Sequence, residues 1–298
     1  MDESQLLQVR RFNRMLTRRI GMLSHDYPGM GRPPGAARLL YEIGPDGATA
    51  RDLRARLGLD SGYLSRMLRA LEKTGLITLR PDAQDARVRR VILTAKGRRQ
   101  WAVLDDRSKG LAAALLEPLG TTQRERLLAA MADVERFLRA SAVTIETADP
   151  FGDEARACIE TYFRELQARF DGGFAPALTV SADPEELVPP HGWFLIARLE
   201  DAPVGCAALK NQGNGVGEIK RMWVDSSARG LGIAQRLLEA LESRAVDVGV
   251  NVLRMDTHRS LAEARALYAR NGYAEIAAYN ANPYAHHWFE KRDLRRSV

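Results

Sequence analysis

Long apolar runs are absent from this chain of 298 residues. No stretch approaches the roughly 18 apolar residues that a membrane-spanning helix requires, and the first segment, MDESQLLQVRRFNRML, is too polar for a secretion signal. Cysteine is scarce: Cys158 and Cys206 lie far apart in the sequence among apolar neighbours. We therefore expect two buried free thiols, no disulfide, no metal site, a cytoplasmic location and no membrane partner.

Charge is unevenly distributed along the chain. Residues 1–140 contain 26 Lys and Arg against 16 Asp and Glu, whereas residues 141–298 contain 18 against 22. The length suggests two domains of ordinary size. A balance of +10 beside one of −4 favours a first domain, residues 1–140, that meets nucleic acid, and a second, residues 141–298, that does not.

Two short helices joined by a tight turn are predicted in the first domain. One begins after Thr49 and is closed by Gly58, and the next runs from Asp60 or Ser61 to about Lys73, with Gly75 as its stop. Strands at 76–80 and 87–93 then enclose a polar tip, as in a β-hairpin. This is a helix-turn-helix followed by a wing.

The run ALEKTGLITLRPDAQDARVRRVILTAKG resembles the winged-helix core of the MarR family of bacterial regulators. The resemblance covers residues 5–140 and implies a mainly α domain that binds double-stranded DNA as a homodimer. Two later helices rich in Leu and Ala, 96–116 and 121–139, would build the dimer. Family members often have Asp-Arg-Arg at the wing, whereas Ala86 follows Asp85 here, so Arg89 or Arg90 could take over part of the DNA contact.

The helix 61–73 is the predicted recognition helix. Its Leu64, Leu68 and Leu71 form one apolar face, and the polar face would enter the major groove. Arginine there can read guanine or grip phosphate; a solvated basic face is the alternative. The residues that we expect to contact DNA, wing included, are Ser61, Tyr63, Ser65, Arg66, Arg69, Arg87 and Arg89.

The stretch GEIKRMWVDSSARGLGIAQRLLEA, residues 217–240, carries most of the chemistry of the second domain. It reads as a strand, a glycine-containing loop and a helix. The loop presents unpaired N–H groups at the positive end of the helix, which is an anion site. The loop is not a Walker motif, because no Gly-Lys-Ser/Thr follows, and it holds no Gly-x-Gly-x-x-Gly.

The loop Arg229-x-x-Gly232-x-Ala234, after a strand that ends in Trp223-Val224, resembles the acetyl-CoA signature of the GNAT N-acetyltransferases. The strand and helix order of residues 142–298 also matches this α+β fold with a central mixed sheet. The resemblance implies acetyl-CoA as co-substrate, with no metal required. The pantetheine would pair with Met222, Trp223 and Val224, and the pyrophosphate would bind Arg229, Gly230, Leu231, Gly232, Ile233 and Ala234.

Resemblance also supplies two candidate acid–base residues. Tyr268 matches a helix tyrosine that protonates the leaving thiolate, and Glu218 matches a carboxylate that acts as base. A packed aromatic and a strand glutamate paired with Lys220 or Arg221 are the alternatives. The N–H of Val224 is a candidate oxyanion donor. His286 and His287 are possible substrate contacts, not metal ligands.

The sequence thus predicts a multidomain regulator that binds DNA and transfers an acetyl group to a small amine or amino-acid-like acceptor. Two other hypotheses remain open. The acetyltransferase half could only sense acetyl-CoA or a small ligand, or the winged helix could serve dimerisation alone.

Overall fold

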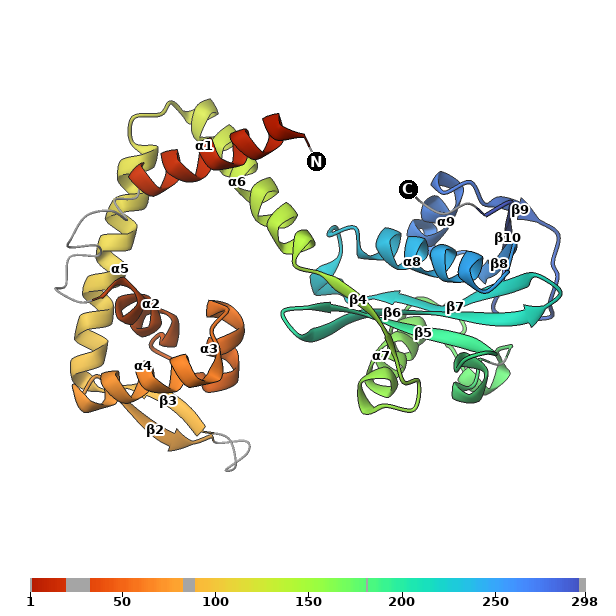
Figure 1. Cartoon of the computed structure of the whole chain (residues 1–298), viewed down its shortest axis with the longest axis horizontal. Helices are drawn as coiled ribbons and strands as arrows, with labels where there is room; N and C mark the ends of the chain where they lie inside the picture. The colour runs from red at the N-terminus through yellow and green to blue at the C-terminus, as the bar shows by residue number, and fades with distance from the viewer. Residues whose placement is uncertain (1, 20–32, 83–88, 181, 295–298) are drawn as a thin grey trace. The chain divides into compact units, whose positions relative to one another are not determined.

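The computed structural model describes residues 2–19, 33–82, 89–180 and 182–294. The chain folds into two compact units, residues 1–130 and 131–298 (Figure 1). Helix α6, Thr121–Ser141, begins in the first unit and ends in the second. The boundary expected at 140 and 141 therefore falls at the end of this helix rather than at the division between the units.

The first unit is mainly helical. Its helices, besides the start of α6, are α1 (Glu3–Arg19), α2 (Pro34–Ile43), α3 (Ala50–Leu57), α4 (Ser61–Lys73) and α5 (Ala95–Leu116). Thr49 caps α3 in a capping box with Asp52, and Asp60 caps α4 by accepting from the N–H of Tyr63 at 2.8 Å. Gly58, with φ of +60°, ends α3 in the left-handed conformation that favours glycine. These local signals place the helix-turn-helix where the sequence predicts it.

A small antiparallel sheet completes the first unit. Its strand order is β1 (Ala48–Thr49), β3 (Arg89–Leu93) and β2 (Ile77–Pro81). Strands β2 and β3 are the predicted hairpin, whose tip at residues 83–88 lies outside the described residues. The two-residue strand β1 was not predicted, because it is too short to show alternation.

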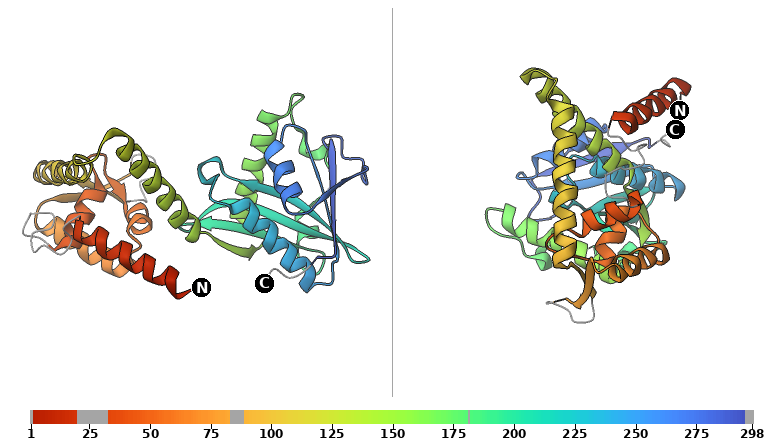
Figure 2. Two further views of the ribbon diagram at one scale, coloured as in Figure 1. Left: turned by 90° about the horizontal axis from the view of Figure 1, so that it is seen from above. Right: turned by 90° about the vertical axis from the view of Figure 1, so that its left-hand side faces the viewer.

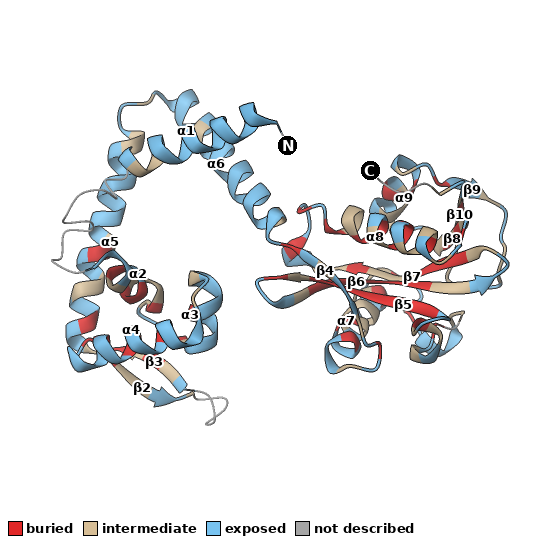
Figure 3. Ribbon diagram, viewed as in Figure 1, coloured by how far each residue is buried: buried red, intermediate tan, exposed pale blue. Residues whose placement is uncertain are grey.

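The core of the first unit lies between the short helices and the small sheet. It includes Leu39 and Leu40 of α2, Leu53 of α3, and Leu64 and Leu71 of α4, each at most 3% exposed. By contrast, α1 and α6 contain no buried residue (Figure 3). Large apolar side chains stay exposed along both helices: Leu6, Leu7, Val9, Phe12 and Met15, and Leu128, Met131, Val134, Phe137 and Leu138.

A seven-stranded sheet organises the second unit. The order is β4 (Thr144–Ala148), β5 (Gly192–Leu199), β6 (Ala202–Gly213), β7 (Val216–Val224), β8 (Val252–Thr257), β10 (His287–Arg292) and β9 (Ala274–Ile276). Among the described strands of this sheet only β7 and β8 pair in parallel, so the sheet is mixed, as predicted. The last strand, β10, enters between β8 and β9, a long-range pairing that local sequence patterns do not encode.

Helices cover both faces of this sheet (Figure 1). Helix α7 (Asp153–Arg169) packs on one face, and α8 (Ile233–Asp247) and α9 (Ala262–Arg270) lie on the other. Figure 2 shows α8 lying over β6 and β7, the strands onto which it packs. Two short 3-10 turns, Pro176–Leu178 and Pro184–Leu187, precede β5, and a third, Ser226–Ala228, follows β7.

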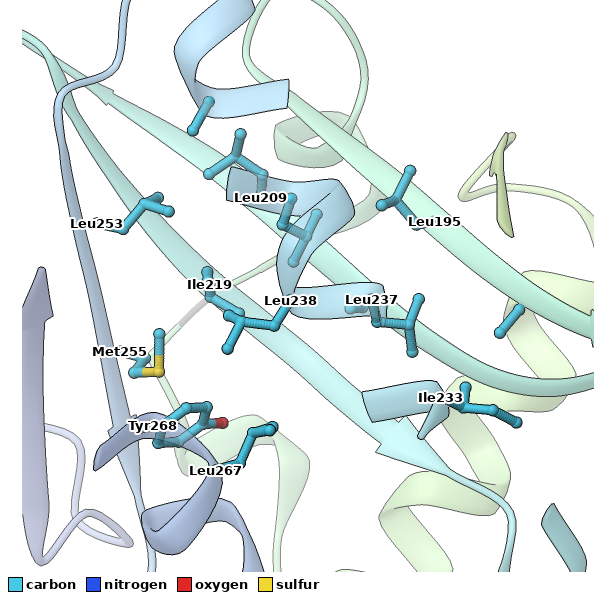
Figure 4. Packing of buried hydrophobic residues seen from close by; sticks show 14 of the residues in the cluster. Leu195, Leu209, Ile219, Ile233, Leu237, Leu238, Leu253, Met255, Leu267 and Tyr268 are labelled. Carbon is cyan, nitrogen blue, oxygen red and sulfur yellow. The ribbon is translucent and has the colours of Figure 1, made fainter. Parts of the chain in front are cut away.

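The larger core lies between α8 and the sheet. Leu237 and Leu238 of α8 are fully buried and face Leu195, Leu209 and Ile219 of the strands (Figure 4). Burial of a leucine side chain stabilises the fold by about 1.5 to 3 kcal/mol. This packing fixes the start of α8 against the end of β7.

A β-bulge interrupts β7 where it pairs with β6. Cys206 lies opposite Trp223 and Ala208 opposite Lys220, so Arg221 and Met222 share one partner position. Arg221 takes a φ of +55°, a conformation that costs a non-glycine residue about 1 to 3 kcal/mol. The Cys206 thiol donates to the Arg221 carbonyl at 3.3 Å. Both cysteines are free and buried, as predicted.

No described helix has the length and apolar character needed to cross a membrane.

Candidate active site and DNA-binding surface

Strands β7 and β8 separate partway along their length. Their parallel register runs from Val216 opposite Val252 to Glu218 opposite Arg254, and the described pairing stops there. On its other edge β7 stays paired with β6 as far as Val224 opposite Gly205. The β8-facing edge of residues 219–224 is therefore open to an extended ligand.

A cavity of about 370 Å³ lies beside the end of this open edge, at Met222, Trp223 and Val224, and we call it the strand-gap cavity. It extends from α7 on one face of the sheet to α9 on the other. Eight of the nine predicted cofactor residues line it: Met222, Trp223, Val224, Arg229, Gly230, Gly232, Ile233 and Ala234. The ninth, Leu231, is 6% exposed and packs in the core instead.

The loop into α8 forms one end of the strand-gap cavity. Gly230 and Gly232 have φ of +80° and +73°, and a Cβ added to either would meet nothing within 4 Å. Glycine is required here for backbone conformation, which other residues adopt only with strain. No side chain caps α8 at Gly232, so the first N–H groups of the helix stay available to an anion.

Glu165 of α7 links three residues around the strand-gap cavity. It accepts hydrogen bonds from Arg229 Nη2 at 2.5 Å, Trp223 Nε1 at 3.0 Å and Arg169 Nη1 at 3.1 Å. Burial raises the pKa of Glu165, but these hydrogen bonds outweigh burial and the pKa falls below its usual value. Glu165 was not predicted from the sequence, because its only local signal is the four-residue spacing to Arg169.

Tyr268 of α9 is buried at 5% exposure and borders the strand-gap cavity. It lies beside Leu267 and Met255 (Figure 4), and its hydroxyl is 3.9 Å from the Met222 Sδ of β7. Burial raises the pKa of Tyr268 well above the usual range, so the phenol keeps its proton. A protonated hydroxyl beside the open edge of β7 can donate a proton there.

Glu218 lies elsewhere. It is 2% exposed and lines a different hollow with Tyr279, Asn280 and Arg254, away from the strand-gap cavity. Its carboxylate is bound by Tyr279 Oη and Gln212 Nε2, both at 2.7 Å, and by Lys220 Nζ at 2.8 Å. The structure therefore does not bring the two predicted catalytic residues into one cavity.

A second cavity adjoins the strand-gap cavity, and we call it the aromatic cavity. The two share Tyr162, Leu166, Met222, Leu261, Ala264 and Tyr268. Beyond this shared wall the aromatic cavity is lined by the rings of Phe170, Phe174, Tyr284 and His258, and by three charged side chains, Lys220, Arg221 and Asp256. None of these seven residues was singled out by sequence reasoning as part of a site.

His258 lines the aromatic cavity, whereas the two predicted histidines, His286 and His287, do not. The ring of His258 stacks on that of Phe170, with the ring centres 3.8 Å apart. Burial, followed by the charges of its neighbours, lowers the pKa of His258. His286 contacts the edge of His258 at 4.5 Å. His287 instead bonds Glu275 at 2.7 Å and Arg265 at 3.3 Å. In the described residues, no group of three His, Cys, Asp or Glu side chains could hold a metal ion.

In the first unit α4 exposes the predicted recognition surface. Leu64, Leu68 and Leu71 are buried, whereas the five predicted contacts on the helix are all exposed: Ser61, Tyr63, Ser65, Arg66 and Arg69. The guanidinium of Arg66 lies 5.7 Å from the centre of the Tyr63 ring.

The wing arginines differ from one another. Arg90 binds Asp82 at 3.1 Å and donates to the carbonyls of Asp46 and Gly47, so it ties β3 to the turn before β1. Arg89 is exposed on the same strand. Arg87 lies outside the described residues.

Comparison with known proteins assigns both halves. Residues 154–273 match the acetyltransferase (GNAT) family, and residues 29–88 match the MarR family. The second half is 36% identical over 135 residues to the IAA acetyltransferase of Azospirillum brasilense, covering 45% of this chain and 85% of that protein. An uncharacterized N-acetyltransferase of Schizosaccharomyces pombe is 33% identical over 97 residues, 32% of this chain and 60% of that protein.

Solved structures align with part of the chain. A GNAT-family acetyltransferase from Staphylococcus aureus aligns with 18% identity and a TM-score of 0.44, over 52% of this chain and 100% of that one. The family model and the relative from Azospirillum confirm the resemblance read from the sequence. The chain belongs to the GNAT acetyltransferase family and carries a MarR-family winged-helix DNA-binding domain ahead of its N-acetyltransferase domain.

Proposed function

We propose that the protein is a transcriptional regulator that binds DNA as a homodimer and transfers the acetyl group of acetyl-CoA to a small amine. The strand-gap cavity carries this proposal. It joins the open edge of β7 to the uncapped start of α8, which matches an extended cofactor arm with an anionic end.

Acetyl-CoA would supply the acetyl group as a thioester, and the cavity residues would hold and orient it. Backbone groups of Met222, Trp223 and Val224 would pair with the cofactor arm. The residues Arg229, Gly230, Gly232, Ile233 and Ala234 would bind the pyrophosphate, with Leu231 fixing the loop in the core. We propose acetyl-CoA, rather than another acyl-CoA, as the donor.

Tyr268 would donate the proton that the departing sulfur needs, because its hydroxyl lies next to Met222 and remains protonated. The amine must lose a proton. Asp256 is the carboxylate that lines the aromatic cavity, and Lys220 joins it to Glu218 through contacts of 3.3 and 2.8 Å. Asp256 would accept the proton that the amine loses, and Glu218 would act on the acceptor only indirectly, through its ion pair with Lys220.

The exposed face of α4 supports the DNA-binding half of the proposal. Arg66 and Arg69 lie on the side opposite the buried leucines, so both are accessible to the major groove of DNA. The apolar side chains left uncovered on α1 and α6 favour a homodimer, since isolated helices seldom leave such faces in water.

The relative from Azospirillum, an IAA acetyltransferase, supports acetyl transfer by this half of the chain. Release of CoA from acetyl-CoA, measured against amines, amino acids and basic proteins, tests the enzyme directly. We expect turnover with a small amine and none with the Gly232→Glu variant, whose side chain would fill the phosphate end of the cavity. Acetyl-CoA binding without turnover on any acceptor would favour a sensor.

Selection of bound fragments from a random DNA library tests the regulator. We expect a pseudo-palindromic site with half-sites about one helical turn apart. Recovery of no preferred sequence would leave the winged helix with a role in dimerisation alone.

A further inference from the structure

The β-bulge of β7 directs two consecutive basic side chains into the aromatic cavity. Along a regular strand Lys220 and Arg221 would point to opposite faces of the sheet. With the bulge, both line this cavity. This arrangement costs conformational free energy, because Arg221 must adopt a positive φ.

The two charges differ in how they are balanced. Lys220 Nζ lies 2.8 Å from Glu218 and 3.3 Å from Asp256, so two carboxylates surround it. Arg221 has no carboxylate within hydrogen-bonding distance among the described residues, and Asp183 acts on it only at longer range. Its pKa falls because burial removes water from the guanidinium.

Within the part of the chain that the structure describes, few donors of Arg221 have a partner. Nη2 reaches the Ala182 carbonyl at 3.5 Å, and the buried Nε has no partner among the described residues. The guanidinium lies 4.7 Å from the centre of the Phe163 ring, which holds its plane in position. A fixed, partly desolvated guanidinium with so few partners among the described residues is suited to a carboxylate, since a guanidinium can bind a carboxylate with two parallel hydrogen bonds.

Beside these charged groups, part of the aromatic cavity wall is formed by aromatic rings. The rings of Phe174 and Tyr284 lie 5.0 Å apart and that of Phe170 lies 5.7 Å from Phe174. These rings are inclined to one another and offer apolar contacts to a side chain. Met222 and Tyr268 separate this space from the strand-gap cavity, so a ligand here would lie next to the thioester.

We infer that the acetyl acceptor is an amino acid with an apolar side chain, whose carboxylate binds Arg221 and whose side chain packs on Phe170, Phe174 and Tyr284. This inference rests on the proposed acetyl transfer. It makes Arg221 a specificity-determining residue that selects acids over neutral amines of the same shape.

Calorimetric titration in the presence of CoA tests this inference. The ligands are phenylalanine and leucine, and each is compared with its amide. We expect the wild-type protein to bind the acids and to bind the amides weakly. Arg221→Gln should weaken binding of the acids by about 10- to 100-fold, the usual loss of a charged hydrogen bond, and leave the amides and CoA unchanged. Arg221→Lys should recover part of the affinity.

Arg259→Gln is the matched control, because Arg259 is an exposed arginine beside His258 that does not line the cavity. Equal affinity for acids and amides in the wild type, or no binding of either, would overturn the inference. Binding of the acids without any CoA release would uphold the anion site and reject acetyl transfer. Turnover of amines with no preference for a carboxylate would uphold acetyl transfer and reject the anion site.

Discussion

Arg229 and Glu165 meet across the strand-gap cavity: Nη2 of the arginine lies 2.5 Å from Oε1 of the glutamate. The arginine precedes α8 and the glutamate belongs to α7, so the pair joins the two layers that enclose the cavity. Glu165 also holds Trp223 at 3.0 Å. One carboxylate therefore fixes both the guanidinium, where we propose that the pyrophosphate binds, and the indole, beside the proposed path of the cofactor arm.

A double-mutant cycle tests this relationship. Arg229→Met should lower acetyl-CoA affinity by about 10- to 100-fold, because a charged hydrogen bond to phosphate is lost. Glu165→Gln should cause a smaller loss by releasing the arginine, and the double variant should bind no worse than Arg229→Met alone. Calorimetry gives all four affinities, with Glu160→Gln, an exposed acid on the same helix, as control. Additive losses would show that the two residues act independently.

Removal of the Tyr268 hydroxyl should affect chemistry rather than binding. If the phenol protonates the departing sulfur, Tyr268→Phe should lower kcat by about 10²- to 10⁴-fold. The acetyl-CoA affinity should stay within about twofold, because the ring still packs on Phe289 and Tyr273. Tyr273→Phe is the matched control, since its hydroxyl binds Glu242 and lines neither cavity. Normal turnover in the Tyr268 variant would return this residue to packing.

These residues show what the sequence could and could not predict. Caps such as Thr49 and Asp60, and the glycine loop at 230–232, depend on neighbours within a few positions, so local patterns predicted them. Glu165 and Arg221 become site residues only through contacts made 64 and 58 positions away. Resemblance predicted Glu218 as base, but its burial among Tyr279 and Gln212 depends on the whole sheet.

Binding to DNA should depend on the exposed arginines of α4. Arg66→Ala and Arg69→Ala should each weaken binding to the selected site, and each should reduce the slope of log K against log salt by about 1 if the lost contact is to phosphate. Arg126→Ala, an exposed arginine on α6, should leave the slope unchanged. Fluorescence anisotropy at several salt concentrations measures both quantities. Loss of affinity on only one sequence would instead indicate that the arginine reads a base.

His258 should make the acetyltransferase domain sensitive to acid. Burial and neighbouring charges lower its pKa in the folded state, so the unfolded chain binds a proton more readily. Stability should therefore fall as pH drops below the unfolded pKa of about 6.5, and level off below the folded pKa. His258→Phe, which keeps the stacking on Phe170, should flatten this part of the profile. Thermal unfolding from pH 5 to 8 measures it, with the exposed His191→Gln as control; an unchanged slope would contradict the assignment.

The last prediction concerns the end of α6. Arg236 of α8 donates from Nη1 to the Ala140 carbonyl at 2.9 Å and from Nη2 to the Val143 carbonyl at 2.8 Å. A cation at this end also suits the helix dipole. Arg236 lies one turn after Gly232, so the helix that would receive the pyrophosphate also holds the C-terminus of α6.

A ligand that shifts the start of α8 would therefore act on α6, the helix whose apolar face we assign to the dimer. We predict a coupling between acetyl-CoA and DNA on the order of 1 kcal/mol, about a fivefold change in affinity. Because coupling is reciprocal, saturating DNA must change acetyl-CoA affinity by the same factor that acetyl-CoA changes DNA affinity. Arg236→Met should bring both factors close to one while each ligand still binds. Equal acetyl-CoA affinities with and without DNA in the wild type would mean that the two domains work independently, because a ligand shifts an equilibrium only through its differential affinity for the two states.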